Sequence, residues 1–356
     1  MTKNPEHTTL SGLPDASSRA EAARPIRVVI CDDSPFMRRM MRMGLDCASD
    51  IEVVGSATTA QEAIELCRAL WPDVLTLDLE LPDASGLTVL REIRSMPVRA
   101  MVVSTFTTDV ASERAVEAMV EGAIDCLGKP NLDAVPSVFV AQLLDRVRNI
   151  ASGAAYFPRH NAAPLKVVEG VARLIVIGTS TGGPRALQAL LSALPAGFPS
   201  PIIVVQHIPA AFTEPFTRRL NRVCELAVQI AVDGDVLTPG HVYIAPSGTH
   251  LHVEGPVLRL RAGSTVNGLM PAIDVTMIDA ATTWGERVTG LVLTGIGQDG
   301  CEGARAIRTA GGHVIAESEL TCAVYGMPRA VVDAGLANDV LPIDQLAGRL
   351  VEEVTT

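Results

Sequence analysis

The stretch at residues 171–187, VARLIVIGTSTGGPRAL, decides the fold of the second half of the chain. Its apolar, β-branched run stops at Gly178, Ser180 follows in a glycine-rich turn, and Pro184 opens a helical pattern. That order predicts a strand, a sharp turn and a helix. A serine in such a turn lies at the carboxyl edge of a sheet beside a helix N-terminus, where developing negative charge is stabilised. Two interpretations stay open at this point: Ser180 is a nucleophile, or the turn is an ordinary connection with a capping hydroxyl.

Length and composition limit the classes of protein to which the chain can belong. At 356 residues it exceeds the size at which one hydrophobic core stops growing, so two domains are expected. Apolar residues make up 48% and aromatic residues only 3%, which predicts aliphatic cores. The net charge of -11 and the lack of a dense lysine and arginine cluster argue against nucleic acid as a partner.

Apolar runs and cysteines in the sequence indicate the cellular compartment of the protein. No apolar run reaches the ~18 residues that a membrane span needs, and the basic-then-apolar pattern of a signal peptide is missing. Seven scattered cysteines without a CxxC pair fit reduced thiols better than disulfides or zinc. The expectation is a cytoplasmic protein without direct membrane insertion.

Changes of pattern along the chain predict four segments. Residues 1–25 are polar and aperiodic and indicate a disordered arm. Residues 26–150 alternate five short apolar runs with five helical patterns, which predicts a doubly wound five-stranded parallel sheet. Residues 151–170 lack a period and indicate a linker. Residues 171–352 alternate again, and a Gly-Pro pair at 255–256 predicts an α/β domain with a mostly parallel sheet and an antiparallel hairpin.

Polar side chains follow the expected strands of the first domain, and a parallel sheet brings such strand ends to one edge. In strand order, these side chains belong to Asp32, Asp33, Asp78, Thr105 and Lys129. Three carboxylates at one edge repel one another unless a cation joins them, and hard oxygen ligands suit Mg²⁺. With Mg²⁺ bound, one carboxylate can attack a phosphoryl group while a lysine and a hydroxyl hold its oxygens. The alternative is a set of solvated loop charges, which the placement of all five at strand ends disfavours.

The motifs CDDSPFMRR, DVLTLDLELPDASGL, VVSTFTT and CLGKP span the first domain, and in them it resembles a two-component receiver domain. The resemblance implies that Asp78 is the phosphoacceptor, with a histidine kinase as phosphodonor. It implies a Mg²⁺ site at Asp32, Asp33 and Asp78. It also implies that Thr105 and Lys129 contact the phosphoryl group.

A serine nucleophile needs a base, and the base needs an acid to orient it. His207 directly follows the expected strand 201–206, so it shares the sheet edge of Ser180 if these strands are parallel neighbours. Asp299 follows the expected strand 288–293 in the glycine-rich stretch LTGIGQDG and belongs to the same edge. Topology therefore selects Ser180, His207 and Asp299, in a chain order that differs from that of α/β-hydrolases.

Long motifs continue through the second half: VIGTSTGGP, VVQHIPAAFT, DGDVLTPGHVYIAPSGTHL, LTGIGQDG and CAVYGMPRA. In them it resembles the catalytic domain of the chemotaxis response-regulator protein-glutamate methylesterase/protein-glutamine glutaminase family. The resemblance implies that Ser180 is the nucleophile, His207 the general base and Asp299 its orienting partner. It implies that Thr181 and the backbone around Ile296 contribute to the oxyanion pocket. No cofactor is expected for the esterase.

One departure from the family bears on the substrate. The family typically has a His-Arg pair where this chain has Leu269 and Met270. The three catalytic candidates are untouched, but a basic contact to an acidic receptor helix is absent from these positions. Substrate affinity or identity is therefore open to change.

The expected function is hydrolysis of glutamate γ-methyl esters on cytoplasmic helices of chemoreceptors, with deamidation of receptor glutamines. Phosphorylation of Asp78 is expected to activate it by shifting a receiver domain that covers the edge around Ser180. Two alternatives stay open. The first alternative is an esterase for a different methylated protein in a non-chemotaxis pathway, and the second is a catalytically degenerate signalling module.

Overall fold

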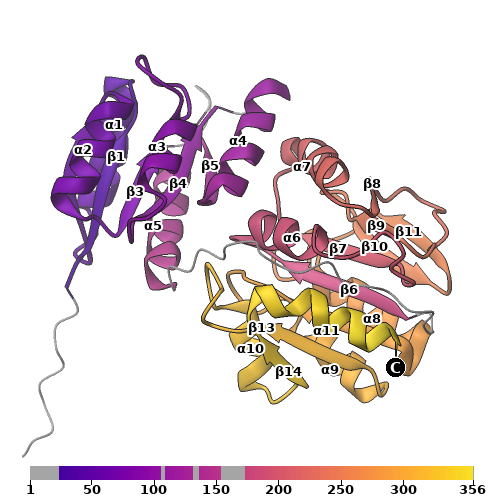
Figure 1. Ribbon diagram of the computed structural model, residues 1–356. Coiled ribbons are helices and arrows are strands. Elements are labelled where there is room, and N and C mark those ends of the chain that lie inside the picture. Colours follow the sequence, from indigo (N-terminus) through magenta and orange to yellow (C-terminus); the bar gives the residue numbers. More distant parts are fainter. Residues whose placement is uncertain (1–23, 106–108, 131–135, 154–172, 356) are drawn as a thin grey trace, which may run out of the picture.

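The computed structural model describes residues 24–105, 109–130, 136–153 and 173–355, which form two α/β domains (Figure 1). The predicted arm at 1–25 and linker at 151–170 lie almost wholly outside these residues. Each domain is built around its own parallel sheet, with helices on both faces.

The first domain has a five-stranded sheet in the order β2-β1-β3-β4-β5, and every pairing is parallel. Helices α1 and α5 cover one face, and α2, α3 and α4 cover the other. All five expected strands and helices are present, which confirms the predicted doubly wound fold. The elements are β1 (Ile26–Cys31), α1 (Pro35–Asp46), β2 (Ile51–Ala57), α2 (Ala60–Leu70), β3 (Val74–Leu77), α3 (Gly86–Ile93), β4 (Arg99–Ser104), α4 (Asp109–Glu121), β5 (Ala123–Gly128) and α5 (Pro136–Ser152).

The second domain has a seven-stranded sheet in the order β14-β13-β12-β6-β7-β9-β8. Every pairing in it is parallel, and the antiparallel hairpin β10-β11 forms a separate two-stranded sheet. The predicted hairpin is confirmed, but it packs beside the sheet and does not extend it. The strands are β6 (Leu174–Thr179), β7 (Ile202–Gln206), β8 (Ala227–Ile230), β9 (His241–Ile244), β10 (His250–Glu254), β11 (Val257–Arg261), β12 (Val288–Val292), β13 (His313–Glu317) and β14 (Asp339–Leu341).

Helices cover both faces of this sheet. Buried side chains of α6, α7 and α11 pack on one face, and those of α8, α9, α10 and the hairpin pack on the other. Among the described residues, no helix combines the length and the apolar content that crossing a membrane requires. The helices are α6 (Gly183–Leu191), α7 (Ala210–Val223), α8 (Ile273–Trp284), the 3₁₀ turn η1 (Gly285–Arg287), α9 (Cys301–Thr309), α10 (Met327–Asp333) and α11 (Ile343–Thr355).

Strand β6 lies between β12 and β7, and this order creates the site edge. Gly178 of β6 pairs with Val292 of β12, and Thr179 pairs with Gln206 of β7. The segments that follow these three strands therefore leave the sheet side by side at its carboxyl edge. Helices α6 and α8 extend from opposite faces of the sheet, which is the arrangement that opens a crevice at a strand-order switch point.

The two domains meet through helix α4, which packs against α6 and α7 (Figure 1). Buried residues of the α2, α3 and α4 layer belong to one apolar cluster with those of α6 and α7. The first domain thus lies against the same face of the second sheet that bears α6, the helix after Ser180.

Helices α8 and α9 cap one another through two aspartates. Asp299, just before α9, accepts the amides of Ile273 and Asp274 at 2.7 and 3.0 Å. Asp274, in the first turn of α8, accepts the amides of Gly300 and Gly303 at 2.9 and 2.8 Å. Each carboxylate satisfies amides that a helix N-terminus leaves unpaired. The loop that positions Asp299 is therefore fixed at both ends.

This exchange predicts a pH-dependent stability. Burial, with the nearby charge of Asp299, raises the pKa of Asp274 from 3.8 to about 6, although the Gly303 and Gly300 amides oppose the shift. Since the folded-state pKa lies above the unfolded value, the contribution of this group to stability is complete below the unfolded pKa and is lost as the pH rises through about 6.

Asp274→Asn keeps an acceptor oxygen and removes the titration. Its free energy of unfolding relative to wild type should therefore rise between pH 4 and pH 7.5, on the order of 2 kcal/mol. Urea denaturation at several pH values measures this difference. The exposed Asp333→Asn serves as the control. A stability difference for Asp274→Asn that does not change with pH would contradict the account.

Candidate active site

The turn after β6 holds Ser180 through its backbone. The Ser180 amide donates to the Thr294 carbonyl at 3.0 Å. The Ser180 carbonyl accepts from the amide of Gly183 at 2.9 Å and from the side-chain amide of Gln206 at 2.9 Å. Gly182 has a φ of 81°, a left-handed conformation that glycine adopts without strain. These bonds tie the serine to the segment after β12 and to the last residue of β7.

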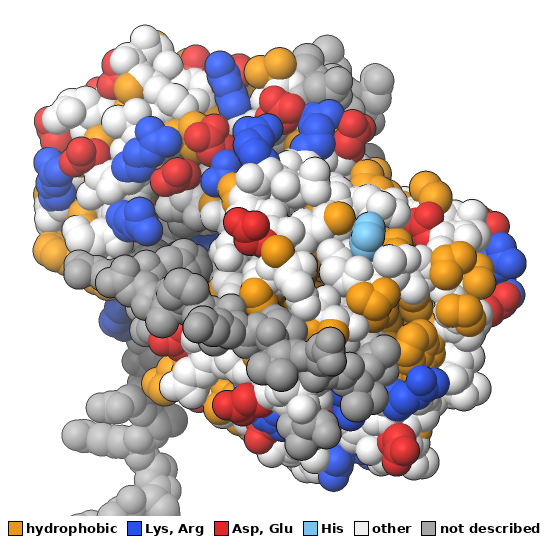
Figure 2. Space-filling view, turned by 45° about the vertical axis from the view of Figure 1, so that its right-hand side comes forward, with side chains coloured by type: hydrophobic (Ala, Val, Ile, Leu, Met, Phe, Trp, Pro, Cys, Tyr) orange, Lys and Arg blue, Asp and Glu red, His pale blue; other side chains and the backbone are white. Residues whose placement is uncertain are grey.

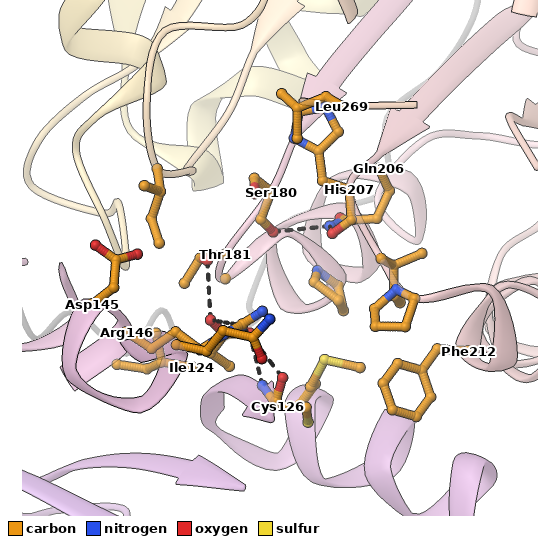
Figure 3. Close-up of a pocket in the computed structure, with 18 residues that line it drawn as sticks. Ile124, Cys126, Asp145, Arg146, Ser180, Thr181, Gln206, His207, Phe212 and Leu269 are labelled. Carbon is orange, nitrogen blue, oxygen red and sulfur yellow. Dashed lines mark hydrogen bonds and ion pairs between the residues drawn. The ribbon is translucent and has the colours of Figure 1, made fainter. Parts of the chain in front are cut away.

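His207 and Asp299 form a hydrogen-bonded pair beside this turn. The His207 Nε2 lies 2.9 Å from an Asp299 carboxylate oxygen, and the side chains are 11% and 3% exposed. The His207 amide donates to the Thr179 carbonyl at 3.0 Å, which anchors the residue next to β6. Ser180 and His207 line one cavity (Figure 3). The structure thus gathers the three residues that the sequence selected at one edge.

Electrostatics keep Asp299 ionised. Burial alone would raise its pKa, but the hydrogen bond from His207 and the amides of Asp274 and Ile273 outweigh burial and lower the pKa below 3.8. A carboxylate bound to Nε2 favours the tautomer in which that nitrogen carries the proton. The second ring nitrogen, Nδ1, is then the basic one. In serine proteases the two nitrogens have the opposite assignment.

The cavity has a volume of about 390 Å³ and is lined by both domains. Figure 3 shows Ser180, His207 and Leu269 on one side and Ile124 and Arg146 on the other. The remaining lining residues are Met119, Asp125, Cys126, Gln142, Asp145, Thr181, Gly182, Pro184, Gln206, Ile208, Pro209, Phe212 and Ile296. Both expected oxyanion contributors, Thr181 and Ile296, are therefore at the cavity. Leu269 presents an apolar side chain to it.

Residues of the first domain bind directly beside Ser180. The Ile124 carbonyl of β5 accepts from the Gly182 amide at 3.0 Å. The Asp125 carboxylate accepts from the Thr181 hydroxyl at 3.3 Å and pairs with Arg146 at 2.5 Å. These contacts are not predictable from the sequence, because Asp125 lies within a strand and carries no local signal of an interdomain role.

A second polar site lies at the carboxyl edge of the first sheet. Asp32 follows β1, Asp78 follows β3, and both are buried. The Lys129 ammonium lies 2.8 Å from Asp32 and 2.5 Å from Asp78. Burial would lower the pKa of Lys129, but the two carboxylates outweigh it and raise the pKa. Burial raises the pKa of Asp32, against the opposing effect of Lys129.

The other expected members of this site differ in position. Asp33 is exposed, yet its carboxylate lies with those of Asp32 and Asp78 so that one oxygen from each falls within 4.8 Å of the others. Three carboxylates at this spacing suit a hard divalent cation. Thr105 is exposed after β4, and the preceding Ser104 donates to Asp78 at 3.1 Å. Ser104 is a site residue that the sequence analysis missed, because a strand-end rule favours the first residue beyond the strand.

Comparisons with known proteins agree with this division of the chain. A response regulator receiver domain model matches residues 28–136, and a CheB methylesterase model matches residues 175–350. The chain is 46% identical to "Protein-glutamate methylesterase/protein-glutamine glutaminase 5" of Myxococcus xanthus, over 92% of this chain and 97% of that protein. It is 38% identical to "Protein-glutamate methylesterase/protein-glutamine glutaminase" of Thermotoga maritima, over 93% and 99%.

A solved structure supports the same family for the second domain. The crystal structure of the Thermotoga maritima CheB methylesterase catalytic domain aligns with a TM-score of 0.50 and 41% identity. The alignment covers 52% of this chain and 99% of that one. The 46% and 38% identity to the two full-length relatives, over more than nine-tenths of each chain, confirms the resemblance. The chain belongs to the CheB family of protein-glutamate methylesterases/protein-glutamine glutaminases with an N-terminal receiver domain.

Proposed function

We propose that this chain hydrolyses γ-methyl esters of glutamate side chains on cytoplasmic helices of chemoreceptors, and that phosphorylation of its receiver domain activates it. The hydrogen bond between His207 and Asp299, at the cavity that Ser180 lines, carries the proposal. The names of the relatives support the methylesterase activity and a role in chemotaxis signalling. A cytoplasmic location follows from such a substrate.

In the proposed reaction the Ser180 hydroxyl oxygen attacks the ester carbonyl while Nδ1 of His207 takes its proton. The C–O bond to the methoxy group then breaks, and His207 returns the proton so that methanol leaves. Water attacks the acyl-enzyme by the same route and releases glutamate. Asp299 stabilises the imidazolium that forms in each half of the reaction.

The tetrahedral intermediate needs hydrogen-bond donors near Ser180. The Ser180 amide already donates to the Thr294 carbonyl, so it is not the donor. Thr181 and the backbone around Ile296 line the cavity and are the proposed contributors. The Gly182 amide, which Ile124 occupies here, is a further donor at the N-terminus of α6.

Deamidation of a glutamine is the same acyl transfer. Ser180 attacks the amide carbon, His207 protonates the departing nitrogen, and ammonia leaves in place of methanol. The side-chain carbonyl of the methyl ester and that of the glutamine bind in the cavity in the same way. One site therefore accounts for both activities in the names of the relatives.

We also propose that Asp78 is the phosphoacceptor. A carboxylate oxygen of Asp78 attacks phosphorus, and the P–N bond of a phosphohistidine on the kinase breaks. The carboxylates of Asp32, Asp33 and Asp78 fit Mg²⁺, which when bound there neutralises phosphoryl charge. Lys129 moves its ion pair from the Asp78 carboxylate to the phosphoryl oxygens, with Thr105 as a further contact.

Regulation follows from where the receiver lies. In this structure the start of β5 binds the Gly182 amide and the Thr181 hydroxyl beside the nucleophile, through Ile124 and Asp125. A substrate helix cannot approach Ser180 while those residues stay in place. Phosphorylation changes the charge at Asp78 and shifts the equilibrium from the docked arrangement of the two domains toward an open one.

Ser180→Ala should lower methanol release from methylated receptor membranes by at least about 10⁴-fold, because the variant has no nucleophile. Phosphate incorporation at Asp78 should persist, since the receiver is intact. Release of radiolabelled methanol, with and without acetyl phosphate, measures the loss. Ser264→Ala, an exposed serine, is the control. A Ser180→Ala variant that releases methanol at the wild-type rate would contradict the assignment of Ser180 as the nucleophile. A wild-type protein that is inactive on receptor membranes would favour a different methylated substrate.

Asp78→Asn should remove the stimulation by acetyl phosphate, because an amide does not form an acyl phosphate. The ratio of stimulated to unstimulated methanol release should fall to about 1, whereas the wild-type ratio should be roughly tenfold or more, and a tenfold ratio corresponds to about 1.4 kcal/mol. Asp46→Asn, at an exposed position on α1, should respond as wild type does. An undiminished response in Asp78→Asn means that another residue is phosphorylated.

A further inference from the structure

Helix α7 links the active-site cavity to a second cavity between the domains. Its first turn contributes Phe212 to the cavity that Ser180 lines. Farther along the helix, Arg218 and Arg222 line a cavity of about 120 Å³ whose opposite wall is helix α4 of the receiver. One helix of the catalytic domain thus leads from the nucleophile to a pair of arginines one turn apart. We call Arg218 and Arg222 the arginine pair.

A glutamate of the receiver forms an ion pair with Arg218, one member of the arginine pair, in this structure. The Arg218 guanidinium lies 2.8 Å from Glu113 of α4 and 2.8 Å from Glu214 of its own helix. Glu117 of α4 lines the same cavity. The Arg218 and Glu113 side chains are 46% and 56% exposed, and ion pairs this exposed contribute little to stability. The contact is therefore easily exchanged for another carboxylate.

The spacing along α7 matches a helical substrate. Six residues separate Phe212 from Arg218 and ten separate it from Arg222, which at 1.5 Å per residue is about 9 and 15 Å. A second helix laid along α7 has the same rise. With a methyl ester in the cavity that Ser180 and Phe212 line, its residues about six to ten positions away reach the arginine pair, and the seventh, two turns along one face, lies nearest Arg218.

We propose that the arginine pair binds carboxylates of an acidic substrate helix, and that Glu113 on α4 holds the place of such a carboxylate while the receiver is docked. The inference rests on the proposed function and names the chemistry of its substrate. Glutamates two turns from the ester are the recognised groups. Release of α4 exposes the pair at the moment when the nucleophile is uncovered.

The surrounding charges favour a carboxylate ligand. Basic and acidic side chains lie close together in the upper half of Figure 2. The cavity places two receiver glutamates opposite the arginines, so the surface already accommodates a helix that bears glutamates. The net charge of -11 makes a nucleic acid an unsuitable occupant.

The test uses the full chain and defined esters. One helical peptide carries a single glutamate γ-methyl ester with glutamates seven residues to either side, and a second peptide has glutamines at those two positions. 4-Nitrophenyl acetate, which has no helix, reports on the Ser180 chemistry alone. Rates are measured with and without acetyl phosphate for wild type, Arg218→Gln/Arg222→Gln, Glu113→Gln and the control Arg259→Gln, another half-exposed arginine in an ion pair.

After activation, wild type and Arg259→Gln should show a KM roughly fivefold to tenfold lower for the glutamate peptide than for the glutamine peptide, because two ion pairs distinguish them. The double arginine variant should lose that preference through KM, with kcat retained. Glu113→Gln should keep the preference and raise the rate without acetyl phosphate severalfold on all three esters, because docking is weakened.

Two results would overturn the inference: a double arginine variant that keeps the preference of wild type, or a Glu113→Gln protein whose rate without acetyl phosphate is unchanged. Failure of the proposed function appears differently, as wild type that cleaves 4-nitrophenyl acetate but neither peptide ester. Thermal unfolding of each variant separates a loss of binding from a loss of fold, since a folded double variant has an unchanged transition.

Discussion

The buried carboxylate of Asp299 is the interaction on which the catalytic edge depends. It accepts hydrogen bonds from the His207 imidazole and from the amides of Ile273 and Asp274. One anion thereby joins the segment after β7, the start of α8 and the loop before α9. Because the hydrogen bonds outweigh the cost of burial, Asp299 stays charged beside His207, where the proposed reaction forms an imidazolium. Asp274 completes the arrangement by holding the same loop from α8.

A second constraint of the proposed function is that the receiver and a substrate need the same surface. The receiver places the Ile124 carbonyl and the Asp125 carboxylate on donors beside Ser180, and its Glu113 on Arg218. These are acceptor oxygens, as the ester carbonyl and glutamates of a substrate are. Exposed pairs at the rim are weak, so docking is balanced by many small contacts rather than one strong bond. Such a balance suits control by a single phosphoryl charge.

Because a parallel sheet turns strand order into spatial proximity, the sequence was sufficient to predict the fold and the polar residues just beyond the strands, but not Ser104 within β4. The role of Asp274 is not predictable from the sequence, because its helical pattern hides a partner that is distant in the chain. Strand β14, at three residues, is too short to show alternation, whereas α11 buries residues at helical spacing that the sequence displays. Contacts between the domains, such as that of Asp125 with Thr181, depend on how two finished surfaces meet.

In the proposed function, Ser180 is a nucleophile that the receiver covers until Asp78 is phosphorylated. The rate at which a fluorophosphonate probe labels the full-length protein tests it most directly, with the labelled residue identified by mass spectrometry. Labelling should fall on Ser180 and should accelerate when acetyl phosphate is added. Labelling at another residue, or on Ser180 at a rate that acetyl phosphate does not change, would contradict it.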